Sequence, residues 1–250
     1  ALTGDVLANA NISGVAGDLS IIASETIRFA GNANLVTGDN AFSTGTLYVE
    51  AINGSVEQLD GSQLIATLGD IRVAAGDSIR LANVTTTANV SLIADEGSIV
   101  DLGDTHIDVS AAQVRLMAGQ GIGLPTNALD IDVDVYAARA GGGGIFLDGA
   151  GAFLIGDASV TVRRYNPDNS TTDISDESLS DVRTISGDGS IVLRALEGDL
   201  ILNDGSTPAD NQVVSAHGAG NIRLEALSAN ADALVNADVV STSGHITLLA

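Results

Sequence analysis

The chain contains no cysteine and no tryptophan, and aromatic residues make up only 3% of its 250 positions. The absence of cysteine excludes thiol catalysis, disulfide bridges and cysteine-ligated zinc. So few large aromatic side chains argue against the core of a compact globular domain. No run of about 18 apolar residues is present, which predicts no membrane insertion, and the first residues lack the pattern of a signal peptide.

Positive charge is also scarce. The ten basic residues are all arginine, whereas 32 residues are aspartate or glutamate, so the net charge is −22. A surface of this sign repels phosphate backbones and anionic lipid headgroups, and we therefore expect no nucleic-acid partner. Most of the carboxylates are expected to form a solvated outer face.

A five-residue phrase recurs nine times: an apolar residue, any residue, an apolar residue, any residue, and alanine. The copies begin at residues 19, 47, 71, 90, 114, 133, 191, 222 and 246. Six copies are preceded two residues earlier by glycine, which lets a chain turn a corner without steric cost. Self-similarity of this kind is typical of solenoid repeats.

The spacing within the phrase decides the type of element. The apolar residues lie two apart, so they share one face of a strand and not one stripe of a helix. Two further short apolar segments follow the first copy, at 27–29 and 35–36, and later copies are similar. Three short strands per turn predict an all-β, three-sided parallel β-helix (solenoid) of roughly ten turns, with each phrase as the first strand of its turn. Val73 and Leu116 then face inward.

We predict one β-solenoid segment over residues 1–250, with regular turns at 17–158 and 189–250. Residues 163–188 are polar and contain no phrase, so they are expected to form one irregular loop excursion. Neither end of the chain carries a polar capping repeat, which would shield the last turn of a solenoid. We therefore expect a stretch of a longer rod, or a rod that stacks end to end with flanking repeats or with copies of itself.

Phe146 precedes this excursion, and Val192 and Ile201 follow it. All three are apolar residues in positions that are polar or charged in most other repeats. Because an uncovered apolar patch is unusual on a monomer, the excursion is expected to fold over part of this surface.

Asp130, Asp132 and Asp134 alternate along a predicted strand, which places three carboxylates on one face about 7 Å apart. Carboxylate oxygens are the ligands that calcium prefers, so these three residues are the candidate calcium ligands. The alternative is a solvated outer face. The glycine run 141–144 lacks the aspartate of glycine-rich calcium repeats, and no other cofactor is predicted.

Candidate catalytic groups are scattered along the chain. His106, His217 and His245 lie in different repeats, with no pair at metal-ligand spacing. Two acidic groups are similar to the carboxylate pairs of polysaccharide-cleaving β-helices: Asp101, Asp104 and Asp108 near His106, and Asp148 with Asp157. Because aspartate is abundant here, such pairs arise by chance, and we expect the chain not to be an enzyme.

Three stretches carry a resemblance to a known family: Gly-Asp-Leu-Ser-Ile-Ile-Ala at 17–23, Gly-Asp-Ile-Arg-Val-Ala-Ala-Gly-Asp-Ser-Ile at 69–79 and Gly-Ser-Ile-Val-Leu-Arg-Ala at 189–195. They resemble repeats of the filamentous-haemagglutinin-like large adhesins and of the giant bacterial surface β-solenoid repeat proteins. The resemblance implies a right-handed parallel β-helix rod in an extracellular location on a bacterial cell surface.

The function expected from this resemblance is that of a structural rod or fibre segment: a stalk, a filament or an adhesin shaft. One alternative is an adhesin binding module that uses the excursion or an exposed sheet to recognise a cell-surface glycan or protein. A second alternative is a polysaccharide-active β-helix enzyme.

Overall fold

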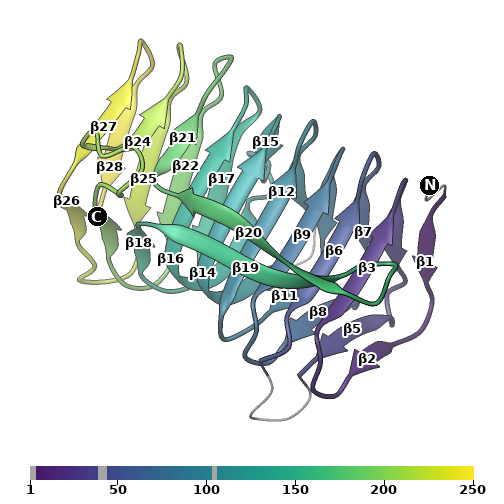
Figure 1. Cartoon of the computed structure of the whole chain (residues 1–250). Coiled ribbons are helices and arrows are strands. Elements are labelled where there is room, and N and C mark those ends of the chain that lie inside the picture. Colours follow the sequence, from purple (N-terminus) through teal and green to yellow (C-terminus); the bar gives the residue numbers. More distant parts are fainter. Residues whose placement is uncertain (1–3, 39–43, 103–105) are drawn as a thin grey trace.

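The computed structural model describes residues 4–38, 44–102 and 106–250, and these residues form β-strands, turns and bends without a helix. Successive strands wind around one axis, and the strands of the solenoid pair in parallel with those of the neighbouring turns (Figure 1). The predicted all-β, three-sided parallel β-helix of roughly ten turns is confirmed. Among the described residues, no helix is long or apolar enough to span a membrane.

The strands stack into three faces, which we name A, B and C in the order in which the chain visits them. Face A contains β3 (Leu19–Ala23), β6 (Leu47–Ala51), β9 (Ile71–Ala75), β12 (Asn89–Ala94), the second halves of β14 (Val109–Ala118) and β16 (Leu129–Ala140), β21 (Val182–Thr184), β24 (Gln212–Ala216) and β27 (Asp238–Ser241).

Face B contains β1 (Val6–Ala8), β4 (Ile27–Phe29), β7 (Val56–Gln58), β10 (Ile79–Leu81), β13 (Ile99–Asp101), β15 (Gly121–Ile122), β17 (Gly144–Gly149), β22 (Ile191–Ala195), β25 (Ile222–Ala226) and β28 (Ile246–Leu249). Face C contains β2 (Ile12–Gly14), β5 (Asn34–Thr37), β8 (Gln63–Ala66), β11 (Val84–Thr85), the first halves of β14 and β16, β18 (Phe153–Ile155), β23 (Leu200–Leu202) and β26 (Ala233–Val235).

The core is one continuous column inside the three faces. Alternate residues of each strand point inward, and Val73 and Leu116 are fully buried, as the phrase predicts. At the corners, stacked glycines approach so closely that a side chain would not fit. A Cβ atom on Gly69 would lie 2.1 Å from the carbonyl oxygen of Gly45, and one on Gly220 would lie 2.3 Å from that of Gly189.

The nine phrases do not all stack on one face. The first five lie on face A, but those at 191, 222 and 246 lie on face B, above Ile145. The copy at 133 is displaced by three residues, because Tyr136 and not Val133 pairs with Val114. An alternating pattern shows which side of a strand faces the core, but it carries no information about which of three similar faces the strand occupies.

The departure from the regular turns is a β-hairpin at 158–179 and not a loop at 163–188. Its strands are β19 (Ala158–Tyr165) and β20 (Thr171–Leu179), and they form an antiparallel pair. The hairpin leaves the solenoid after face C, and the chain returns to face A at β21. Figure 1 shows the hairpin lying across face A, so that it runs along the rod over the earlier turns. It does not cover face B, where Phe146 and Val192 lie.

The alternation on β10 can be tested with neighbouring substitutions. Ile79 is fully buried in the core, whereas Arg80 beside it is exposed. Ile79→Asp should bury an unpaired charge between two other turns and cost several kcal/mol of unfolding free energy. Arg80→Asp should change it by less than about 1 kcal/mol. Urea unfolding followed by circular dichroism measures both, and equal losses would show that the inward and outward assignment is wrong.

Candidate functional site

The predicted calcium ligands lie on β16 in alternate positions. Asp132 and Asp134 are exposed, Asp130 is half-buried, and the apolar residues between them face the interior. Asp132 and Asp134 line a shallow depression with Thr86 and Ser110 from neighbouring turns. Among the described residues, a different trio of carboxylates brings its ligand atoms within 4.8 Å of one another.

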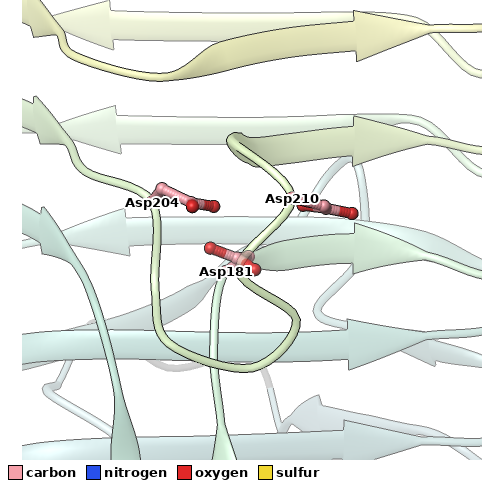
Figure 2. Close-up of side chains that lie close together, drawn as sticks. All are labelled: Asp181, Asp204 and Asp210. Carbon is pink, nitrogen blue, oxygen red and sulfur yellow. The ribbon is translucent and has the colours of Figure 1, made fainter.

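That trio consists of Asp181, Asp204 and Asp210, which we call the aspartate cluster (Figure 2). Asp181 follows the hairpin, and the other two belong to the loop between β23 and β24. Asp181 is fully buried and has a positive φ of 67°. Figure 2 shows the loop bringing Asp204 and Asp210 to opposite sides of Asp181.

Arg183 holds the aspartate cluster together. Its guanidinium donates to Asp181 Oδ2 at 2.9 Å and to both carboxylate oxygens of Asp210 at 2.6 and 2.9 Å. The backbone N–H of Gly205 donates to Asp181 Oδ1 at 2.9 Å. Asp204 Oδ2 accepts from a backbone N–H at 3.0 Å, whereas its buried Oδ1 has no partner among the described residues.

The electrostatics of the aspartate cluster follow from burial and from Arg183. Burial raises the pKa of Asp181 above its usual range, although its hydrogen bonds to Gly205 and Arg183 oppose this. Hydrogen bonding to Arg183 lowers the pKa of Asp210. The carboxylate oxygens of the cluster are ligands that a hard cation could use. The Arg183 guanidinium, however, already donates hydrogen bonds to Asp181 and Asp210. The arrangement shown therefore serves to fix the loop, and its members are too far apart in sequence for a motif to have predicted them.

The other predicted catalytic residues are separated in space. Asp148 lies on face B and pairs with Arg194, whereas Asp157 follows β18 on face C and accepts a hydrogen bond from the Ser206 backbone. Asp101 and Asp108 are buried in the interior, where a polysaccharide has no access. Asp104 lies outside the described residues. The ring of His217 is 2.7 Å from the Gly187 carbonyl oxygen, and His106 and His245 lie at other corners.

A pocket of about 240 Å³ lies on face B. Its apolar part is formed by Phe146 and Val192 together with Leu124 and Pro125 of the preceding turn. Two arginines line its charged side, and each is paired: Arg194 with Asp148, and Arg223 with Glu225. The pocket can thus offer an apolar surface beside polar groups.

A series of polar contacts joins the hairpin to face A. Three alternate backbone N–H groups of β19 donate to side chains of three successive turns. The pairs are Thr161 to Asp70 at 2.9 Å, Arg163 to Thr46 at 2.8 Å, and Tyr165 to Ser20 at 3.1 Å. These groups form the edge of β19 that does not face β20, so the solenoid satisfies an edge that would otherwise be open.

Side chains complete the contact beneath the hairpin. Tyr48 packs against Val160 and Val162 in a small apolar cluster. Burial, and then a 2.6 Å hydrogen bond to Glu50, raise the pKa of Tyr48 to about 12, so its hydroxyl remains protonated. Arg72 lies 5.5 Å from the centre of the tyrosine ring and donates to Asp176 at 3.1 Å.

No protein-family model matches the chain, and no match to it was found among curated proteins or solved structures.

The role of Arg183 in the aspartate cluster gives a direct prediction. Arg183→Gln removes the cation beside the fully buried Asp181, and breaking such a pair costs about 3 kcal/mol. The matched change Arg80→Gln removes an exposed arginine that has no ion pair among the described residues, and it should be nearly neutral. Chemical unfolding of the two variants measures the difference. Equal stabilities would mean that Arg183 does not hold the cluster.

Proposed function

We propose that this chain is a structural rod segment of a very large secreted bacterial surface protein, where it serves as a stalk, filament or adhesin shaft. The observation that carries the proposal is the lengthwise hairpin. It lies against β3, β6, β9, β12, β14 and β16, which belong to six successive turns. The proposal assigns no catalytic activity to the chain.

The hairpin changes how the turns depend on one another. In a solenoid each turn contacts only its neighbours, so the stack can open one turn at a time. A hairpin bonded to several turns must detach before any one of them can separate. This arrangement favours resistance to bending and pulling, which a shaft needs and a small-molecule site does not.

The last turn supports an end-to-end partner. Ile246 is 42% exposed, whereas Ile222, which pairs with it one turn earlier, is 1% exposed. The corresponding pair, Leu248 and Leu224, is 42% and 0% exposed. These inward side chains form an exposed apolar surface, and the proposal includes a second copy of the chain stacked on β28.

The second candidate function is that of a binding module for a cell-surface glycan. The face B pocket favours it, because Phe146 and Val192 offer an apolar surface while Arg194 and Arg223 offer polar contacts. A glycan-array signal that disappears in Arg223→Ala, with unchanged stability, would favour this function over the rod.

Pulling the chain from both ends tests the rod. Asp157 and Ser180 flank the hairpin and are hydrogen-bonded to each other, so a short glycine-rich linker can replace residues 158–179. We expect the intact chain to open its first six turns together at high force, and the linker variant to open them in smaller steps at lower force. Tyr165→Ser, which alters an exposed hairpin side chain, is the control. Identical force traces for the linker variant and the intact chain would contradict the proposal that the hairpin holds these turns together.

The end contact has its own test in sedimentation velocity. Leu248→Arg places a charge in the exposed apolar column and should reduce association at high protein concentration. Thr247→Arg adds the same charge on the outward side of the same strand and should leave association largely unchanged. A chain that is monomeric at every concentration would count against stacking between copies.

A further inference from the structure

The base of the hairpin rests on the outward side of β14. Met117 packs there against Ala137, Ala158 and Leu179. Ala158 is the first residue of β19 and Leu179 the last residue of β20, so Met117 lies where the hairpin leaves and rejoins the solenoid. The chain has one methionine and no cysteine, and the thioether of Met117 therefore contains its only sulfur atom.

The sulfur atom contacts a buried guanidinium. Arg115 is 8% exposed, and it forms no ion pair among the described residues. Its Nε donates to the Glu177 carbonyl oxygen at 3.0 Å, and its Nη1 donates to Ser91 Oγ at 3.4 Å. Its Nη2 donates to Met117 Sδ at 2.8 Å. Because a thioether is only a weak acceptor, this buried cationic donor is poorly satisfied.

A second guanidinium lies beside Met117 on the next turn. Arg139 pairs in register with Met117, so their side chains leave neighbouring strands about 4.8 Å apart. Within the part of the chain that the structure describes, Arg139 has no ion pair and no side-chain hydrogen bond. Its other neighbour in register is Arg183, whose charge is already paired with Asp181 and Asp210. Arg139 therefore lies beside a like charge and lacks an acceptor.

Met117 and Arg139 line the same pocket, which has a volume of about 160 Å³. Ile93 and Ile185 form part of its apolar wall. Asp95 also lines the pocket, but it is exposed and forms no ion pair with Arg139. Met117 is half-buried, and the pocket has room for several water-sized molecules. A molecule as small as hydrogen peroxide can therefore reach the methionine side chain while the hairpin stays in place.

We propose that Met117 is an oxidation site for hydroperoxides, and that Arg139 binds the oxygen of the resulting sulfoxide at the base of the hairpin. The sulfur lone pair attacks one peroxide oxygen, the O–O bond breaks, and the leaving hydroxide takes up the remaining proton as water. The sulfur is oxidised and the peroxide is reduced. The sulfoxide oxygen is a stronger acceptor than the thioether, so Arg139 gains the partner that it lacks. The proposal is independent of the rod function.

The first test is treatment of the folded chain with hydrogen peroxide, followed by mass spectrometry. We expect the chain to gain a single oxygen atom, located on Met117 by fragmentation. Met117→Leu has a side chain of similar size without sulfur, and it should gain none under the same conditions. A folded chain that stays unmodified, while the urea-unfolded chain gains the oxygen, would overturn the proposal.

The second test measures the coupling between the sulfoxide and Arg139 by urea unfolding of the oxidised and unoxidised forms. In Arg139→Leu, which has no donor, oxidation should raise the unfolding equilibrium constant about tenfold more than in the unaltered chain, because a hydrogen bond from a charged group is lost. Arg139→Lys keeps a cationic donor and should behave like the unaltered chain. Arg80→Leu, which removes an exposed arginine on face B, is the matched control and should leave the effect of oxidation unchanged. Equal effects of oxidation in Arg139→Leu and in the unaltered chain would show that Arg139 does not bind the oxygen.

Discussion

The hydrogen bonds between successive turns are the constraint on which the rest of this molecule depends. Each strand pairs in parallel with its equivalents above and below, so each residue lies over the residue in the same position of the next turn. Val73, for example, lies between Val49 and Leu92, and all three are fully buried. Small and apolar residues therefore recur in columns, and a residue that does not fit its column disturbs two neighbours.

The same stacking places charged residues directly over one another on the outer surface. On face B, Arg28 lies above Glu57 and donates to it at 2.8 Å, and later in the rod Asp148 lies beside Arg194. Like charges in such positions would repel at the close spacing of paired strands. With only ten basic residues to pair with 32 acidic ones, the chain places several arginines where stacking brings a carboxylate next to them.

The hairpin is the one described element that does not obey the turn-by-turn order. It uses outward positions of face A that would otherwise be solvated, and this explains why arginines on equivalent positions have different environments. Arg72 and Arg115 lie under the hairpin and bond to Asp176 and to the Glu177 carbonyl, whereas Arg80 on face B is exposed. The proposed stiffness of the rod and the small apolar cluster around Tyr48 have the same origin.

Polar side chains in the interior differ in how well the neighbouring backbone groups can satisfy their hydrogen bonds. Gln58 points into the core, where its amide donates to the Asn83 carbonyl at 2.9 Å and its oxygen accepts from a backbone N–H at 3.4 Å. An amide has both a donor and acceptors, so a column of backbone groups can satisfy it. Asp101 and Asp108 have only acceptors when ionised, and each keeps one buried oxygen that has no partner among the described residues.

The sequence by itself determined the strand period, the three strands per turn, the buried positions such as Val73 and Leu116, and the glycine corners. These features are local, because alternation and corner residues act within one turn. Only the tertiary structure decided which face each phrase occupies, that residues 158–179 form a hairpin over face A, and that Asp181, Asp204 and Asp210 meet around Arg183. The docking of the hairpin on face A joins residues up to 145 positions apart, and the loop that carries Asp204 and Asp210 reaches Asp181 across more than 20 positions; a repeating pattern contains no signal for such contacts.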